Sequence, residues 1–521
     1  YKQARDIAVN LVELHSRLIA TNVKNDADMT FTAINTLPQK RKDTVIVKTY
    51  VPGGKFAIID EKGNDVDYTI IKSRDLTDYV LSQTIMLDPS RKFYVPDQVL
   101  EVTMAIKAND VPALGYVQYS IDTQKDSHKE TADKKVLENK YYTIEVEENG
   151  SLTIVDKANN VTYKNQGILV ENGDDGDSFN YSPPRKDMEV FSNESKCTVK
   201  ISGSDIYDQA EIHFDMVVPA DLDERAEGKV SVTMLVDMTV ALRKDSKVID
   251  FNVKVDNKGL SHRLCVLFDS QIVSAFNYAD QQFGLIKRPN YYEKEMKLYM
   301  ESMNNKTEKK AGIQELANWA NDQSTWQEPP ISIEPTQSYV SLTDGKTGIA
   351  VIPQGVREYE VLDDSKIRLT LFRTYGFMGK ENLIYRPGRA SGERIIETPA
   401  AQLLKEMEFN FGFTSYAGDI NDSDIDTLAK QYNTNLEVYT YAEFLNGRLI
   451  FSQREIEGQN AKIHSLFETE GNLVVSAVKK AEEDDGYIIR LYNGKDHKDL
   501  DDKIKFNFDI KEAYYTNLKE E

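Results

Sequence analysis

The chain has 521 residues, a formal net charge of −21 and only two cysteines. Its length predicts several domains, because single hydrophobic cores stop growing at roughly 250–300 residues. The negative charge disfavours nucleic acid and anionic membranes as partners, and no apolar run approaches the ~18 residues that span a bilayer. An acidic surface is typical of a bacterial cytosolic protein, so we expect a cytoplasmic location. Cys197 and Cys265 are expected to be free thiols, since one disulfide would be incidental in so long a chain.

The first predicted element is an amphipathic helix over Tyr1–Asn22. Its apolar residues recur at the i, i+3, i+4, i+7 spacing of one helical face, with charged residues between them. A single helix cannot bury such a stripe. We therefore expect this helix to belong to a truncated helical bundle whose other members precede Tyr1.

From about Met29 the hydrophobic period changes to two, which indicates strands. Runs rich in β-branched residues are separated by Asn-Gly and Asp-Gly turns and continue almost to the C-terminus. The clearest runs are Thr44–Val51, Tyr141–Val146, Lys229–Val236, Val248–Val255 and Lys366–Phe372. Strands without regularly alternating helices predict a mainly β protein built of antiparallel β-sandwiches.

Composition shifts divide the chain into four expected domains. These are the bundle helix at 1–27, a small β-sandwich at 28–125, a large β-domain at 136–415, and a C-terminal β-domain with a short helix at 416–521. A stretch rich in lysine and aspartate, 122–135, is interpreted as a linker.

The sequence contains no short catalytic signature of the GxSxG, HExxH, Walker A or CxxC type. None of its six histidines stand at a metal-ligand spacing, so we expect no metal site within this chain.

Two segments could contact a ligand. Residues 171–184 combine three aspartates, two glycines and two aromatic residues after an apolar run. Carboxylates accept hydroxyl hydrogen bonds and aromatic faces stack on pyranose rings, so a sugar site is one reading, beside a calcium-like loop and a plain solvated turn. Residues 385–394 carry two glycines and three arginines, which could hold a carboxylate or vicinal hydroxyls, or simply pair with the acidic surface. Trp319 and Trp326 could cover a core edge or stack on sugar.

Seven motifs occur in an order that resembles glycoside hydrolase family 38, especially its bacterial α-mannosidases and mannosylglycerate hydrolases. They cover nearly the whole chain. The matching segments are Phe31–Arg41 (FNxLPxxR), Val111–Tyr116 (PALGY), Leu137–Tyr142 followed by Asn149–Leu152 (LENxYY…NGxL), Asp174–Pro183 (DxGDxYDYSP), Leu369–Arg373 (TLxR), Arg386–Gly392 (RPGRxSG), and Ser476–Lys480 with Arg490–Asn493 (SAxKK…RxxN).

This resemblance implies a retaining α-mannosidase with a zinc-containing N-terminal α/β-barrel, a helical bundle and β-sandwich domains, the largest similar to the galactose mutarotase super-sandwich. The nucleophile, the general acid and the zinc ligands would lie outside this chain, so no catalytic residue and no bound cofactor are expected in it. The resemblance places a sugar-contacting aromatic near Phe179, where the family usually has Tyr, and an arginine near Arg389. The candidate substrate-binding residues are Asp175, Asp177, Phe179, Tyr181, Arg386 and Arg389.

Three functions remain open from the sequence. The chain could complete an α-mannoside cleft with the missing catalytic barrel, or act as a non-catalytic carbohydrate-binding β-sandwich protein. It could also serve only as a scaffold, with association into a homo-oligomer.

Overall fold

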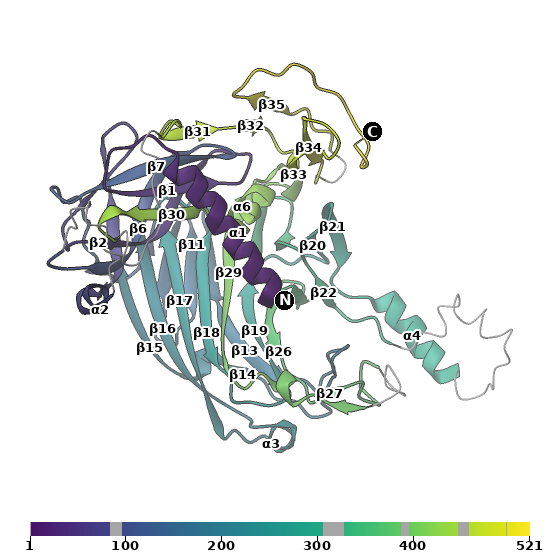
Figure 1. Ribbon diagram of the computed structural model, residues 1–521. Helices are drawn as coiled ribbons and strands as arrows, with labels where there is room; N and C mark the ends of the chain where they lie inside the picture. Colours follow the sequence, from purple (N-terminus) through teal and green to yellow (C-terminus); the bar gives the residue numbers. More distant parts are fainter. Residues whose placement is uncertain are drawn as a thin grey trace.

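The computed structural model describes residues 2–83, 96–305, 328–386, 395–445, 458–495 and 498–520. The helix α1 (Lys2–Thr21) comes first and runs diagonally beside the sheets, with its C-terminal end next to β1 and β30 (Figure 1). Only Ser16, Ala20 and Thr21 of this helix are buried, whereas apolar residues such as Leu11 and Leu18 are at least half exposed. The amphipathic helix is thus present, but most of its apolar stripe faces solvent.

A large sandwich forms the body of the molecule. Its ten-stranded sheet has the order β21-β20-β23-β24-β29-β18-β17-β16-β15-β8, and its six-stranded sheet has the order β14-β13-β19-β26-β25-β22. The strands of the first sheet are β8 (Ala132–Asp133), β15 (Lys196–Gly203), β16 (Tyr207–Val218), β17 (Val232–Arg243), β18 (Ile249–Asp256), β20 (Phe276–Gln281), β21 (Gly284–Pro289), β23 (Val340–Thr343), β24 (Thr347–Gln354) and β29 (Glu406–Ala417). Those of the second are β13 (Ile168–Gly173), β14 (Val190–Phe191), β19 (His262–Asp269), β22 (Ile333–Pro335), β25 (Glu358–Leu362) and β26 (Lys366–Arg373).

The two sheets share one hydrophobic core with a smaller four-stranded sheet, β12-β11-β10-β9. These four strands are β9 (Leu137–Glu138), β10 (Tyr142–Val146), β11 (Leu152–Asp156) and β12 (Val161–Gln166). In β17, alternate residues from Met234 to Leu242 are buried, while the residues between them face outward. This period of two is what one buried face of a sheet requires, and the neighbouring strands of each sheet pair antiparallel.

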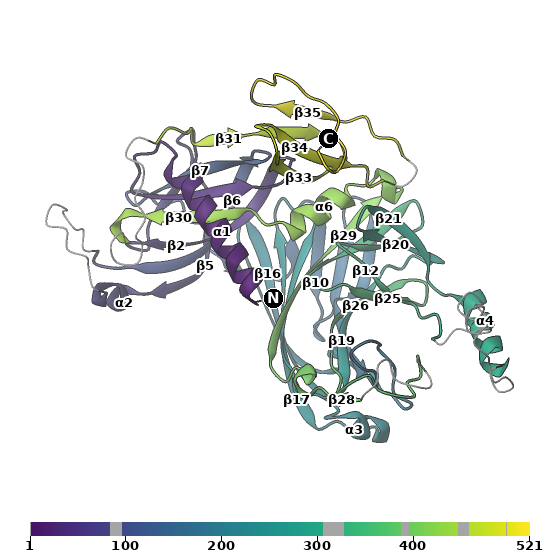
Figure 2. The same cartoon turned by 45° about the vertical axis from the view of Figure 1, so that its right-hand side comes forward.

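A second body packs beside the large sandwich (Figure 2). It contains a six-stranded sheet, β30-β1-β7-β3-β4 with β31 on β7, and a three-stranded sheet, β2-β6-β5, around a core of their own. The strands are β1 (Met29–Asn35), β2 (Arg41–Val51), β3 (Ala57–Ile59), β4 (Asp65–Val66), β5 (Tyr68–Asp75), β6 (Leu100–Val111), β7 (Gly115–Asp122), β30 (Glu437–Ala442) and β31 (Ile463–Ser465). The pairing of β30 with β1 joins residues about 400 positions apart, from Met29 with Ala442 to Ile34 with Glu437.

Three two-stranded sheets complete the β structure: β27 (Phe377–Met378) with β28 (Ile396–Glu397), β32 (Phe467–Glu470) with β35 (Lys503–Phe506), and β33 (Val474–Lys480) with β34 (Tyr487–Tyr492). Among the described residues, the other α-helices are α2 (Thr77–Ser82), α3 (Leu222–Glu227), α4 (Glu293–Asn305) and α6 (Ile425–Asn433). Of these, α6 covers part of the outer face of the ten-stranded sheet, where it packs on residues such as Ala350 and Ile352 of β24.

The prediction of a mainly antiparallel β fold behind one leading helix is confirmed. The division into four domains stays a prediction. Both cysteines are free thiols, Cys265 being buried and Cys197 only partly so. Across the described residues, no helix combines the length and apolar character that crossing a bilayer requires.

Candidate functional site: two loops joined at strand ends

The site is built where β13 and β26 end, on either side of the first residues of β19 in the six-stranded sheet. β13 pairs with β19 so that Gly173 lies opposite His262, and β19 pairs with β26 so that Arg263 lies opposite Arg373. The loop that follows β13 and the loop that follows β26 therefore leave the sheet at the same end of its strands. Residues 174–189 and 374–386 are called the loop cluster here.

Arg373 joins the two loops. Its guanidinium donates two hydrogen bonds to the buried carboxylate of Asp174, at 2.6 and 3.1 Å, and two more to the backbone carbonyls of Asp177 and Asn180, both at 2.9 Å. Burial raises the pKa of Asp174, and the Arg373 charge opposes that rise. The planar guanidinium suits this arrangement, because its N–H donors have a fixed geometry and bind one carboxylate and two carbonyl oxygens from a single rotamer of Arg373.

Asp177 is the second anchor of the cluster and is completely buried. Its carboxylate accepts the backbone N–H groups of Phe179 and Asn180, at 2.9 and 3.0 Å, and that of Lys380 at 2.8 Å, and it pairs with the buried Arg386. Burial acts to raise the pKa of Asp177, but the Arg386 charge and the donated hydrogen bonds outweigh it and leave the pKa below its ordinary value. The predicted residues Asp177 and Arg386 thus meet each other and fix the turn that presents Phe179.

Phe179 and Asp175 lie on the outside of this frame. The Phe179 ring is 59% exposed although its backbone is held at both ends. Asp175 forms an ion pair with Lys380, and about 30% of each of these two side chains is exposed. An exposed ring beside a carboxylate can stack on the apolar face of a sugar while the carboxylate accepts hydroxyl hydrogen bonds.

Tyr181 points the other way, into the protein. It is 7% exposed, its hydroxyl accepts a hydrogen bond from Asn172 at 3.1 Å, and the Arg263 guanidinium lies 4.0 Å from its ring centroid. The Tyr385 ring contacts it edge to face, with centroids 6.0 Å apart. Burial raises the pKa of Tyr181, so the phenol stays neutral at the base of the cluster.

A buried polar group supports the cluster from below. His262 places Nδ1 at 2.9 Å from Glu171 Oε1 and Nε2 at 2.9 Å from Asn257 Oδ1. Glu171 Oε1 also accepts from Arg225, and the Asn257 amide nitrogen donates to two backbone carbonyls, which fixes the orientation of that amide. Both ring nitrogens of His262 therefore lie within hydrogen-bonding distance of a buried side-chain oxygen. This group ties α3, through Arg225, to the strand ends that carry the two loops.

The comparisons with known proteins identify the fold that presents this cluster. The profile of the glycosyl hydrolases family 38 C-terminal domain matches residues 137–377, and that of the family's C-terminal beta sandwich domain matches residues 472–521. The chain belongs to glycosyl hydrolase family 38. It carries the C-terminal domains of that family, and the first match includes Asp174, Phe179 and Arg373.

Relatives of the chain carry names from the same family. A protein of Halalkalibacterium halodurans named "Putative mannosylglycerate hydrolase" is 24% identical over 379 residues, which cover 69% of this chain and 36% of that protein. Two solved structures from Enterococcus faecalis match the fold, a protein in glycosyl hydrolase family 38 (TM-score 0.73, 18% identity) and an alpha-mannosidase (TM-score 0.72, 20% identity). These matches cover 97% and 94% of this chain but only 57% and 54% of the two structures. The family 38 chain therefore spans about a third of the length of the curated relative and a little over half of each structure.

The family 38 chain gathers five of its six predicted contact residues at the loop cluster, although their contact with a substrate stays a prediction. Arg389, together with Trp319 and Trp326, lies outside the described residues. Sequence reasoning missed Lys380 and did not select Arg373, which closes the TLxR-like motif. A charged residue at the end of an otherwise buried strand was the available signal for Arg373.

The described residues contain no group of three or more His, Cys, Asp or Glu side chains that could hold a metal ion. The zinc implied by the family resemblance therefore has no ligand set in the part of the chain that the structure describes.

Proposed function

We propose that this chain forms the β-domain part of an α-mannosidase-like glycoside hydrolase and completes the substrate cleft of a catalytic domain held elsewhere. The observation that carries this proposal is the presentation of Phe179, an exposed aromatic ring on a turn that buried charges hold in place. Water solvates charged loop residues readily. An aromatic ring on a fixed turn, by contrast, leaves its apolar surface exposed to water unless a ligand or another protein surface covers it.

In this proposal the residues of the cluster have two different roles. Phe179 contacts the sugar, and Asp175 with Lys380 offers a carboxylate and an ammonium to hydroxyl groups. Asp177 and Arg386 act as positioning residues, because each is nearly or completely buried and bonded to the other. Bond cleavage and any metal chemistry belong to the catalytic domain, and this chain alone is expected to release no 4-nitrophenol from 4-nitrophenyl α-mannoside, with or without added zinc.

The exposed stripe of α1 supports a docking role as well. Ile7, Leu11 and Leu18 are 54%, 50% and 55% exposed, which is unfavourable for a helix that remains uncovered in water. We propose that helices of the catalytic part of the enzyme cover this stripe. Burying the exposed half of these three side chains would contribute roughly 2–5 kcal/mol before entropy costs.

The test compares variants in the polypeptide that joins this chain to a family 38 catalytic domain. Phe179→Ala is expected to lower kcat/KM for α-mannosides by about tenfold, as the loss of one stacked ring costs about 1–2 kcal/mol. Phe179→Tyr should retain activity, since it keeps the ring and adds a hydroxyl. Phe283→Ala is the matched control, because Phe283 is also a highly exposed phenylalanine (81%) but lies on the β20–β21 hairpin.

Two outcomes would contradict the proposal. If Phe179→Ala and Phe283→Ala both behave like the parent enzyme, Phe179 does not lie in the cleft. If the chain alone hydrolyses the substrate, its catalytic centre is within these domains. The carbohydrate-binding alternative would gain support if the chain alone bound α-mannosides and Phe179→Ala abolished that binding.

A further inference from the structure

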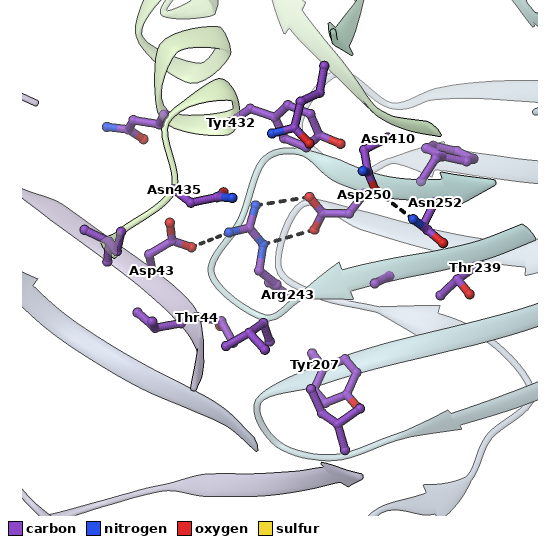
Figure 3. A pocket seen from close by; sticks show the side chains of 18 of the residues that line it. Asp43, Thr44, Tyr207, Thr239, Arg243, Asp250, Asn252, Asn410, Tyr432 and Asn435 are labelled. Carbon is purple, nitrogen blue, oxygen red and sulfur yellow. Dashed lines mark hydrogen bonds and ion pairs between the residues drawn. The ribbon is translucent and has the colours of Figure 1, made fainter. Parts of the chain in front are cut away.

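A cleft separates the small β2-β6-β5 sheet from the outer face of the ten-stranded sheet (Figure 3). Its volume is about 620 Å³, within the roughly 300–1,000 Å³ typical of small-molecule sites. Strands β17, β18, β29 and β24 form its floor, β2 and β5 form one wall, and the last turn of α6 with the segment leading to β30 closes one end.

The floor carries a row of neutral hydrogen-bonding side chains. Thr239 lies opposite Asn252, Asn252 opposite Asn410, and Asn410 opposite Gln354, so that four adjacent strands each contribute one member. The Asn252 amide donates to Asn410 Oδ1 at 2.8 Å, which orients both side chains. Three side-chain groups make no hydrogen bond to another described group: Oδ1 of Asn252, Nδ2 of Asn410 and the whole carboxamide of Gln354. These atoms are free to bond a ligand.

The charges in the cleft neutralise one another. Arg243 lies between Asp43 and Asp250, with Arg243 Nε at 3.0 Å from Asp250 Oδ2 (Figure 3). Arg41 also pairs with Asp43, at 2.7 Å. Two guanidinium groups thus face two carboxylates, leaving Glu437 as the only charged lining residue outside this set. In a chain with a net charge of −21, so neutral a surface suits an uncharged ligand.

The wall opposite the amide row is partly apolar. Ile46 of β2 and Ile71 of β5 line the cleft and are 53% and 39% exposed. A pyranose ring has one apolar face and a rim of hydroxyl groups, each of which can donate and accept. A slot with exposed isoleucines on one side and free carboxamides on the other matches both features.

We propose that this cleft binds a neutral oligosaccharide at a site separate from the loop cluster. The two sites lie toward opposite ends of the sandwich, since β17 runs from near α3, beneath the loop cluster, to Arg243 in the cleft. Twelve residues of extended strand correspond to roughly 35–40 Å. This binding does not depend on Phe179 touching substrate, so the proposed function and this second site can fail independently.

The experiment measures binding of mannotriose and maltotriose to the full chain by isothermal titration calorimetry. Asn410→Ala removes a free amide, and Ala241→Trp places a large side chain in the cleft without removing any ligand contact; Ala241 is one of the lining residues. Thr233→Ala is the matched control, because Thr233 is on the same face of β17, six residues from Thr239, which is roughly 20 Å along the strand. Thermal melting of each variant shows that it is folded.

We expect at least one of the two sugars to bind, Asn410→Ala to weaken that binding about fivefold to tenfold, and Ala241→Trp to abolish it. Thr233→Ala should leave it unchanged. Oligogalacturonate, the anionic counterpart, should bind at least about tenfold more weakly because the acidic surface repels it. Absence of binding by both neutral sugars, or binding that Ala241→Trp leaves intact, would overturn the proposal. Loss of binding in Phe179→Ala alone would place the sugar at the loop cluster instead.

Discussion

Replacing Arg373 by methionine tests the physical account of the loop cluster. The substitution keeps the length of the side chain but removes all four hydrogen bonds that hold Asp174 and the carbonyls of Asp177 and Asn180. The Asp174 side chain is 0% exposed and that of Arg373 is 18% exposed, so the variant leaves a buried carboxylate without its partner. Breaking such a pair costs about 3–5 kcal/mol.

The expected change in melting temperature follows from the size of the sandwich. If the roughly 280 residues from Leu137 to Ala417 unfold together, an unfolding entropy of about 2.1 cal/mol/K per residue converts 3–5 kcal/mol into a decrease of about 5–8 °C. Differential scanning calorimetry measures this directly. Arg357→Met is the control, because Arg357 is exposed, and its melting temperature should stay within about 1–2 °C of the parent value.

The sign of the pH dependence provides a second check. Burial raises the pKa of Asp174 and Arg373 opposes that rise, so the pKa in Arg373→Met rises further. The folded variant then binds a proton more tightly than the unfolded chain does, and its stability falls as the pH rises. The deficit relative to the parent should be small near about pH 4 and largest at about pH 7.

A double variant separates the charge from the hydrogen bonds. Asp174→Asn combined with Arg373→Met has no buried charge and should recover roughly half of the lost stability, the rest reflecting the unpaired carbonyls. The reasoning is refuted if Arg373→Met melts like Arg357→Met, or if the double variant is less stable than Arg373→Met alone.

Three further predictions concern other sites. Asp177→Asn should be less stable than the parent at neutral pH but should lose less stability on acidification. The reason is that the lowered pKa of Asp177 provides stability that is lost as the pH falls below about 4. Urea unfolding at several pH values measures this difference. His213→Gln should remove a small stabilisation, under about 1 kcal/mol, that is present below about pH 6.5 and lost as the pH rises, since hydrogen bonding to Asp237 raises the pKa of this partly exposed histidine; an unchanged profile would contradict it. Gly115→Ala should release β31 from β7, because a Cβ at Gly115 would lie 2.0 Å from the His464 carbonyl oxygen. Hydrogen exchange at residues 463–465 should then accelerate at least about tenfold, and unchanged protection would contradict the prediction.

The sequence located some strands closely and others less well: the run Lys229–Val236 covers only the first part of β17 (Val232–Arg243). The run Lys366–Phe372 corresponds to β26 and Val248–Val255 to β18, each within one residue of the observed bounds. The ordered motifs also led to the correct family. Local patterns sufficed for both, because the alternation of buried residues and the order of short motifs are properties of contiguous segments.

The candidate site was located by sequence but not described by it. Asp177 and Arg386 are 209 positions apart, and their residue types alone were compatible with two independent sugar contacts. Their mutual burial shows that they hold the turn, whereas the exposed Phe179 ring is available to a ligand. Whether a polar side chain faces a ligand or another side chain depends on burial, and burial depends on the packing of distant segments.

By itself, the sequence determined the acidic character, the strand period and the family. Only the tertiary structure decided which strands meet: β30 pairs with β1 across about 400 residues, and the Thr239–Gln354 row forms because β17, β18, β29 and β24 align in register. A period of two specifies which face of a strand is buried, but it does not specify the neighbouring strand. Both the loop cluster and the cleft therefore arise from pairings that no local pattern encodes.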